Sequence, residues 1–406
     1  MGTQYGRLIL NFRKIIIMSL VQRLLILLLL CSHIAMAQTP ELVPYRKGDQ
    51  FGYANEKKEI KIPVQYDFAG LFSEGLAVVK MEGKYGYIDK TGKLIIPADY
   101  DQAGSFSEGL AAITSNLKAG YINTKGKIVI PQTYDNSYSF QDGFARVKLN
   151  KKNGLIDKKG KVIVPVEYDN ISAFSEGMAQ VSKDKKYGYV NTNGKLTVPL
   201  DYNYGLAFSE GLAPVDKNGL YGFVDKTGKE IIAHKYKRAY MFKEGLAYVK
   251  GIDDKMGFID KNGNEVIALK YDNVGQFSEG LARVTMNEKS GYIDKTGKEV
   301  IPFQFESYGS VFTQGLARIT LNGNYGYIDK TGKLVIANKY RLAEDFSDGL
   351  ALVFRDKKYG YVDKTGKEVI PIQYDECYSF TNGLAMVYIK KKMVFIDRKG
   401  TLYNED

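Results

Sequence analysis

Short runs of apolar residues alternate with polar, glycine-containing turns along nearly the whole chain. In one representative stretch, residues 76–80 (LAVVK), 85–89 (YGYID) and 93–96 (KLII) are rich in β-branched and aromatic residues and predict three short strands. Pro97 has no N–H to give to a ladder and is predicted to end the third strand. Residues 98–108 are expected to be an irregular crossover. The pattern predicts small antiparallel units without helices.

The turn between the second and third predicted strands has a specific chemistry. It reads Asp89-Lys90-Thr91-Gly92. An Asp side chain can accept hydrogen bonds from backbone N–H groups two residues on, and Gly supplies positive φ without a Cβ clash. The sequence therefore predicts a hairpin turn here, and Asn replaces Asp in some copies, which a turn tolerates.

This unit is repeated along the chain. The glycine of the second predicted strand returns in steps of 34 residues, twice 35, at Gly52, Gly86, Gly120, Gly154, Gly188, Gly222, Gly257, Gly291, Gly326 and Gly360. Self-similarity at a fixed period is typical of repeat architectures. Comparison of the copies identifies columns that scarcely vary, and these are predicted to be structural; their representatives are Phe106, Gly109, Ala111, Gly86, Gly92 and Tyr100.

We expect an all-β tandem array over residues 48–406. It would hold ten three-stranded antiparallel units of about 34 residues in an open, twisted, solenoid-like stack. The alternative is a closed β-propeller, but propellers usually have about four to eight blades of roughly 40–45 residues. Residues 38–47 are expected to be a linker. The first and last units depart from the repeat and are expected to be caps.

One column varies strongly in residue type and is predicted to be exposed. It lies between the invariant Ala and a β-branched residue, on the first strand of each unit. The candidates for a binding surface in this column are Arg146, Gln180, Tyr248, Arg283 and Arg318.

The N-terminal segment predicts export. A leucine-rich run at 24–30 follows Arg23 and precedes Ala35-Met36-Ala37, so residues 1–37 predict a signal peptide cleaved between Ala37 and Gln38. Met18 is an alternative start to Met1. Cys31 follows Leu30, where a lipoprotein signal normally has a small residue, so lipidation stays open. The run is too short to span a bilayer, and no later span follows.

Charge and composition add little specificity. The net charge of +11 falls to +7 without residues 1–37, because four basic residues and no acid are lost from 57 basic and 46 acidic residues. The turn lysines predict either a basic rail for anionic glycans or lipid headgroups, or a solubilising edge offset by neighbouring Asp. Export argues against a nucleic-acid partner.

Catalytic and metal chemistry find little support. After cleavage only His234 and Cys377 remain of their types, so neither a disulfide nor a nucleophile–base arrangement can be assembled. No Cys/His cluster has zinc spacing. The acids of the recurring S-E-G element are too many and too alike for one catalytic pair, and their repetition favours a turn role.

The joint pattern resembles a known family. G-[YF]-[IV]-[DN]-x-x-G-K, followed by Y-D and F-x-[ED]-G-L-A, is similar to the bacterial WG-repeat (KWG-type) family over residues 48–406. The chain has no Trp, and the place before the glycine holds mainly Tyr, as at Tyr85, Tyr187 and Tyr221. The resemblance implies a repeat-built architecture compatible with binding, and it transfers no catalytic residue.

Together these features favour an exported, non-catalytic, monomeric binding or scaffold protein without cofactor. Its partner would be a cell-envelope or extracellular protein or glycan, in the periplasm or outside the cell. Two alternatives stay open: a glycan-active enzyme with paired carboxylates, and a purely structural spacer.

Overall fold

The computed structural model describes residues 39–306 and 309–405, and the regular structure in these ranges is entirely β. Three long strands and one short strand recur along the chain. The first long strands are β1 (Val43–Lys47), β5 (Leu76–Met81), β9 (Leu110–Ser115), β13 (Phe144–Leu149), β17 (Met178–Lys183), β21 (Leu212–Lys217), β25 (Ala247–Lys250), β29 (Ala282–Met286), β32 (Leu316–Leu321), β36 (Leu350–Arg355) and β40 (Leu384–Ile389).

The second long strands are β2 (Gln50–Ala54), β6 (Lys84–Asp89), β10 (Lys118–Asn123), β14 (Lys152–Asp157), β18 (Lys186–Asn191), β22 (Leu220–Asp225), β26 (Met256–Ile259), β30 (Lys289–Ile293), β33 (Asn324–Asp329), β37 (Lys358–Asp363) and β41 (Lys392–Asp397). The third are β3 (Ile60–Tyr66), β7 (Leu94–Tyr100), β11 (Ile128–Tyr134), β15 (Val162–Tyr168), β19 (Leu196–Tyr202), β23 (Glu230–Tyr236), β27 (Glu265–Tyr271), β31 (Glu299–Glu306), β34 (Leu334–Tyr340) and β38 (Glu368–Tyr374).

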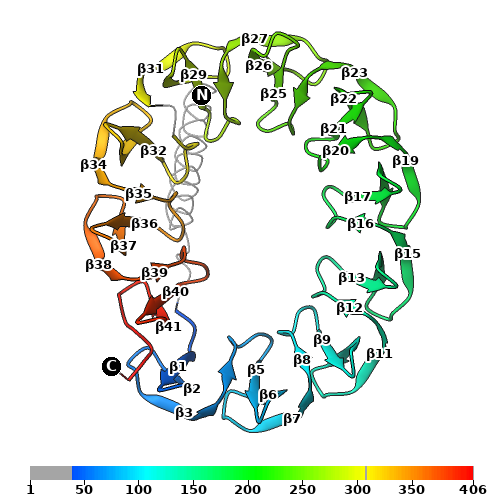
Figure 1. Cartoon of the computed structure of the whole chain (residues 1–406), viewed down its shortest axis with the longest axis vertical. Coiled ribbons are helices and arrows are strands. Elements are labelled where there is room, and N and C mark those ends of the chain that lie inside the picture. The colour runs from blue at the N-terminus through cyan, green and yellow to red at the C-terminus, as the bar shows by residue number, and fades with distance from the viewer. Residues whose placement is uncertain (1–38, 307–308, 406) are drawn as a thin grey trace, which may run out of the picture.

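The short strands lie in the segments expected to be irregular. They are β4 (Phe68–Ala69), β8 (Gln102–Ala103), β12 (Asn136–Ser137), β16 (Asn170–Ile171), β20 (Tyr204–Gly205), β24 (Arg238–Ala239), β28 (Asn273–Val274), β35 (Leu342–Ala343) and β39 (Glu376–Cys377). A typical sheet has the order β4-β5-β6-β7, and its neighbouring strands are antiparallel. The short strand lies toward the centre of the molecule and the third long strand lies along the rim (Figure 1).

The third strand does not end at its proline. β7 continues from Leu94 through Pro97 to Tyr100, and its register against β6 shifts on both sides of Tyr87. A bulge is one of the few places in a sheet that accepts proline, because the missing N–H is not needed there. A Cβ on Gly86 would lie 2.7 Å from the Ile96 carbonyl oxygen, so this glycine permits the bulged strand to approach.

The hydrophobic core lies between neighbouring sheets. One cluster joins Leu76, Tyr87 and Ile96 of one sheet to Phe106 and Ile113 of the next. Similar clusters recur along the chain, as the stacking argument from the sequence required. Each sheet is therefore stabilised mainly by its two neighbours.

The sheets form a closed ring, so the expectation of an open solenoid was wrong. Eleven small sheets are arranged as a β-propeller around a central opening (Figure 1). β1 meets the end of the chain: the Arg46 amide donates to the Tyr403 carbonyl at 2.9 Å, and the Glu405 amide donates to the Arg46 carbonyl at 3.1 Å. Tyr403 is fully buried there among Val43, Tyr45 and Leu384.

Wedge-shaped units explain the closure. Each complete sheet has a two-residue strand on its inner side and a strand of seven or eight residues on its outer side. Repeated wedges turn in one direction, and here eleven of them complete the circle. The usual range of about four to eight blades, on which the expectation rested, reflects longer blades than these.

Both ends differ from the expected linker and caps. Val43–Lys47, in the segment predicted to be a linker, forms β1 and pairs with β2. The two departures from the repeat, at the first and last units, lie at the junction that closes the ring. The predicted signal peptide, its cleavage site at Ala37 and Gln38, Cys31 and the alternative start all lie outside the described residues.

Candidate functional site

The S-E-G element forms a tight hairpin in each sheet. The Ser73 amide donates to the Leu76 carbonyl at 2.9 Å, and the Leu76 amide donates back at 3.0 Å. Both central residues have positive φ, 53° for Glu74 and 85° for Gly75. These are the dihedrals of a type I′ turn, which usually holds Asn or Gly at both places. Glu at the first place therefore needs a further reason.

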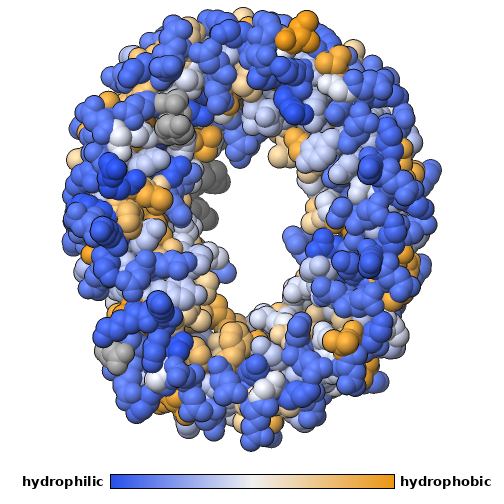
Figure 2. All heavy atoms as spheres, viewed as in Figure 1, coloured by the Kyte–Doolittle hydropathy of each residue, from blue (hydrophilic) through white to orange (hydrophobic). Residues whose placement is uncertain are grey.

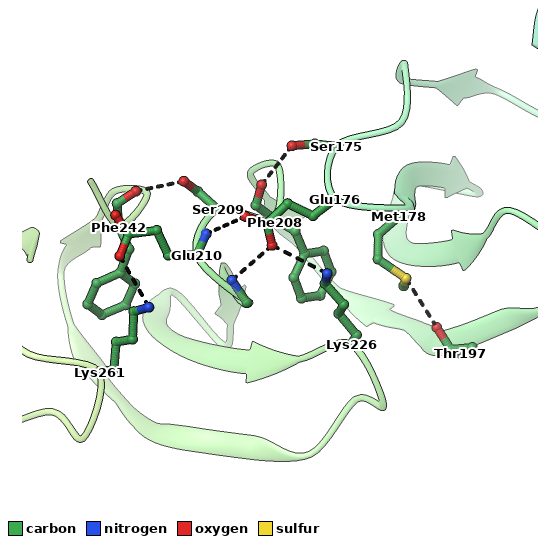
Figure 3. A network of polar contacts seen from close by, with 11 residues as sticks. Ser175, Glu176, Met178, Thr197, Phe208, Ser209, Glu210, Lys226, Phe242 and Lys261 are labelled. Atoms are coloured by element: carbon green, nitrogen blue, oxygen red, sulfur yellow. Dashed lines mark hydrogen bonds and ion pairs between the residues drawn. The ribbon is translucent and has the colours of Figure 1, made fainter. Parts of the chain in front are cut away.

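The glutamate connects one blade to the next. The Glu176 carboxylate accepts hydrogen bonds from the Glu210 amide at 2.6 Å and the Gly211 amide at 2.9 Å, in the corresponding turn of the following blade (Figure 3). The Ser175 hydroxyl donates to the Phe208 carbonyl at 2.8 Å in the same seam. Asp348 makes the equivalent contact with the Gly383 amide at 2.9 Å. Gly could form the turn but has no side chain for this second contact, and Asn lacks the negative charge that the carboxylate brings to it.

A lysine of the following blade completes the link. Lys226 lies 3.4 Å from Glu176, and Lys261 lies 3.2 Å from Glu210 (Figure 3). At Glu108 the hydrogen bond from Lys158 is the main reason that the pKa of the carboxyl is lowered, with the Gly143 amide adding to it. These turn lysines pair with the glutamate of the preceding blade. In the solubilising edge considered from the sequence, neighbouring Asp residues would instead balance their charge.

A buried tyrosine hydroxyl forms a fourth kind of link across the seams. The Tyr87 hydroxyl donates to the Gly104 carbonyl of the next blade at 2.7 Å, and the Tyr189 hydroxyl donates to the Leu206 carbonyl at 2.6 Å. Phe replaces this Tyr at Phe223 and Phe258, where the ring stays buried without the hydroxyl. The ring also packs on the invariant Phe of the next blade, with centroids 4.9 Å apart for Tyr87 and Phe106.

One seam between complete blades lacks all four links. It joins the blade β12–β15 to the blade β16–β19, and we call it the 142 seam after Asp142. Gln141 and Asp142 replace Ser and Glu in its turn, Thr192 replaces the lysine, and Leu155 replaces the ring. Within the described part of the chain, the Asp142 carboxylate has no hydrogen-bond or ion-pair partner.

A cavity of about 270 Å³ opens at this seam. Leu155 lines it at the place where other blades bury a ring, and the turn residue Asp142 lines it from the same blade. Phe174 of the next blade is only half-buried and packs on Phe144, with ring centroids 4.8 Å apart. Arg146 also lines the cavity, and its guanidinium carbon lies 3.9 Å above the centroid of the Tyr138 ring.

A family model decides the identity of the repeat. The model of the WG containing repeat matches residues 51–85, 85–116, 120–152, 154–187, 187–221, 221–255, 256–289, 291–325, 325–359 and 359–392. The chain belongs to the WG-repeat family. The resemblance drawn from the sequence motif is thereby confirmed, although Tyr mainly replaces the motif's Trp.

Solved structures and curated proteins add no functional detail. A search of curated proteins finds no match. A eukaryotic initiation factor is 12% identical, with 90% of this chain and 95% of that chain covered and a TM-score of 0.42. BamB from Moraxella catarrhalis is 12% identical, with 74% and 95% covered and a TM-score of 0.33. The computationally designed protein Ika8 is 14% identical, with 70% and 91% covered and a TM-score of 0.37. Likenesses this distant carry no functional argument.

The predicted binding column of the WG repeats is largely occupied by contacts within the ring. The Gln180 side-chain amide donates to the Gly205 carbonyl of the next blade at 2.6 Å, and Arg318 donates to the Ala343 carbonyl in the equivalent way. Tyr248 stacks on Tyr240 with centroids 4.1 Å apart.

The two remaining arginines of the column differ from each other. Arg283 is half-buried beside Thr285 and Ser290, and desolvation lowers its pKa. Arg146 is the member of the predicted set that lines the cavity of the 142 seam. Other positions of this column are buried, such as Val78 and Leu352, so the column as a whole is not an exposed surface.

The residues predicted to be structural lie as follows. Phe106 and Ala111 are buried in the core between blades, Tyr100 is half-buried, and Gly109 and Gly92 have φ of 87° and 86°. In the predicted turn, the Thr91 and Lys93 amides donate to the Asp89 carboxylate at 2.8 and 3.1 Å.

The remaining titratable candidates have local roles. His234 lies 2.7 Å from Glu230 through its Nδ1 atom and stacks on Tyr202. Cys377 is buried, and burial raises the pKa of its thiol to about 12. Among the residues described, no three His, Cys, Asp or Glu side chains gather as metal ligands would, and no helix has the length and hydropathy to cross a bilayer.

A second variable column was missed by the sequence reasoning. It is the first residue of each short strand, two positions after the recurrent ring of Tyr66 and its equivalents. Its members are exposed, begin the strands that lie toward the centre of the ring (Figure 1), and differ in chemistry: Phe68, Gln102, Asn136, Asn170, Tyr204, Arg238, Asn273, Leu342 and Glu376. The variation is visible in the sequence, but a segment expected to be irregular does not indicate which of its side chains are exposed.

Proposed function

We propose that this WG-repeat propeller is an exported, non-catalytic binding ring for a protein or glycan of the cell envelope or extracellular space. The single observation that carries the proposal is the inner-edge column, defined as the exposed first residues of the short strands listed above. The repeated residues are used in contacts between blades, whereas this column changes from aromatic to amide to charged around one opening. The described residues leave a central opening in the space-filling view (Figure 2).

The chemistry of the inner-edge column is that of a contact surface. Aromatic residues and arginine are enriched at protein interfaces, and aromatic faces also stack on sugars. Phe68 and Tyr204 are 37% and 43% exposed. Phe68 packs edge-on against Tyr85 of its own blade, and Tyr204 packs edge-on against Tyr187 of the preceding blade. Rings held in this way lose little conformational entropy on binding. The signal peptide predicted at residues 1–37 supports a location outside the cytoplasm.

The S-E-G acids give little support to a glycan-active enzyme. Glu176 and its equivalents already accept hydrogen bonds from backbone amides and lysine, which suits a structural carboxylate. A general acid would need a raised pKa, and the hydrogen bond from Lys158 instead lowers the pKa of Glu108. We therefore propose binding and not hydrolysis as the activity of the ring.

The test compares two matched triple variants in binding to glycan arrays and in pull-downs from cell-envelope extract. One carries Phe68→Ser, Tyr204→Ser and Leu342→Ser in the inner-edge column. The control carries Ile60→Ser, Leu94→Ser and Ile128→Ser, which are apolar residues on the outer third strands and at least as exposed as the inner-edge residues.

Partner capture that survives the outer variant and is lost by the inner variant supports the proposal. A structural spacer predicts no specific partner and no difference between the variants. Either of these results, or equal loss in both variants, would refute the inner edge as the binding surface.

A further inference from the structure

The cavity at the 142 seam lies where the repeat loses its buried ring. A hollow of about 290 Å³ also lies at the preceding seam, lined by Ala112 and Tyr138, but there Tyr121 keeps its place in the core. At neighbouring seams a Tyr or Phe fills this volume and packs on the next blade's Phe, as Tyr121 packs on Phe140 at 4.9 Å. Leu155 leaves the volume open, and the Phe of the next blade, Phe174, turns to Phe144. Leu takes the ring's place only here among the ten WG repeats.

Two opposite charges line this cavity without partners. In the described part of the chain, neither the Asp142 carboxylate nor the Arg146 guanidinium has a hydrogen bond or an ion pair, and Arg146 only stacks on Tyr138. Equivalent side chains at other seams are hydrogen-bonded: Glu176 accepts from backbone amides, and Arg318 donates to a carbonyl. The two free groups therefore remain available to a ligand.

The rest of the wall is apolar. Leu155 and Ile171 are buried at its base, and Phe144 and Phe174 stand half-buried at its side. We propose that the 142 seam binds a free α-amino acid with an apolar side chain. Arg146 pairs with its carboxylate, Asp142 pairs with its ammonium group, and the side chain lies against Phe144 and Phe174.

The charges and the size select this ligand class over others. A simple anion would face the like charge of Asp142. A neutral sugar could hydrogen-bond to both groups through its hydroxyls but would bring no opposite charge to either, and charge-assisted hydrogen bonds are the stronger ones. A metal ion would need further ligands, which the described residues do not gather. About 270 Å³ is near the lower end of roughly 300–1,000 Å³ for small-molecule sites, so the ligand is small. This site goes beyond the proposed partner surface and does not depend on it.

Ligand analogues test the two charges separately. Calorimetric titration of the full chain compares L-phenylalanine and L-leucine with 3-phenylpropionate, which lacks the ammonium group, and with 2-phenylethylamine, which lacks the carboxylate. We expect each single-charge analogue to bind about ten- to a hundredfold more weakly than phenylalanine, the loss typical of one charged hydrogen-bonded contact.

Variants of the protein test the location. Leu155→Tyr restores the residue that other repeats carry, so it should fold well while filling the cavity and abolishing binding. Phe223→Tyr is the matched control, because it introduces the same side chain at the equivalent position of a seam without the cavity, and binding should not change. Arg146→Met should weaken phenylalanine about ten- to a hundredfold and leave 2-phenylethylamine nearly unaffected.

Two outcomes would overturn the site: neither amino acid binds at millimolar concentration, or Leu155→Tyr binds as the original chain does. Equal binding of phenylalanine and 3-phenylpropionate would refute the role of Asp142 and with it the assignment to amino acids.

Discussion

The closure of the ring depends on a small junction at the chain's end and can be tested directly. The residues after β41 lie between β41 and β1: the Tyr403 amide donates to the Phe395 carbonyl at 3.0 Å, and the Tyr403 carbonyl accepts from the Arg46 amide at 2.9 Å. Each such bond contributes a net of about 0.5–1.5 kcal/mol. Lys47 also pairs with Glu405 at 2.6 Å, but solvent screens an exposed ion pair and it adds little to stability.

Burial of Tyr403 is the largest contribution to the junction. Its side chain is fully buried against β1 and β40. Truncation of large buried aromatic residues to Ala costs about 3–5 kcal/mol. We therefore expect Tyr403→Ala, or deletion of residues 402–406, to release the two ends of the ring and to lower the midpoint of urea unfolding.

The assay is the distance between the two ends. Spin labels on Asp49→Cys and Lys391→Cys, both at exposed positions, report this distance by pulsed electron paramagnetic resonance, while Cys377 stays buried. The intact chain should give one short, narrow distance, because Lys392 lies 3.6 Å from Asp49. Tyr403→Ala should broaden the distribution toward long distances.

An interior tyrosine supplies the control. Tyr340 is also fully buried, in a core between two blades far from the junction. Tyr340→Ala should lower stability to a similar extent while the labels stay close together. A long label distance in the unaltered chain, on the order of 100 Å for units stacked in an open array at roughly 10 Å each, would refute the closed ring.

Three further predictions concern single contacts within and between the blades, each checked by urea unfolding. Gly120→Ala should cost about 3 kcal/mol, because its Cβ would lie 2.5 Å from the Ile130 carbonyl oxygen. Gly109→Ala, which meets nothing within 4 Å but has φ of 87°, should cost only about 1–2 kcal/mol; equal costs would contradict the close-approach argument. Tyr189→Phe should cost about 1 kcal/mol for the lost hydroxyl contact, and no measurable loss would contradict that link. The pKa of Glu108 is lower in the folded than in the unfolded chain, so its contribution to folding stability is present above about pH 4.5 and is lost as the pH falls through the folded pKa. Glu108→Gln should therefore make the stability depend less on pH in this range. An unchanged pH profile of stability would contradict the link.

Local chemistry made the strands and turns predictable, whereas the assembly was not. Asp89 and Gly92 determine their turn through contacts within five residues, so the sequence contains the whole argument. Closure depends instead on a small rotation per blade summed over eleven sheets, and an error of a few degrees per unit separates a ring from an open stack. The prediction that Pro97 ends its strand was wrong for a related reason. A proline would end an isolated strand, but the sheet accepts it in the bulge opposite Gly86.

The candidate site was only partly predictable. The variation of its column indicates Arg146 as a binding residue, yet other members of that column are engaged within the ring, as Gln180 is with Gly205 of the next blade. A side chain's exposure depends on the neighbouring blade's position, which a single strand's pattern does not show. The functional reason for Glu in a type I′ turn was likewise hidden, since Glu176 meets Gly211 only in the assembled ring.

Departures from a repeat are more informative than the repeat itself when each copy has the same structural task. In an array stabilised by nearest-neighbour interfaces, a seam that loses its links weakens two blades at once. The 142 seam gives up the serine, glutamate, lysine and tyrosine links together, through Gln141, Asp142, Thr192 and Leu155. Independent drift would scatter such losses among the seams, and stability favours their repair. The four lost links lie together around one cavity with two unpaired charges. This is expected at a binding site, where residues that bind a ligand replace residues that stabilise the fold.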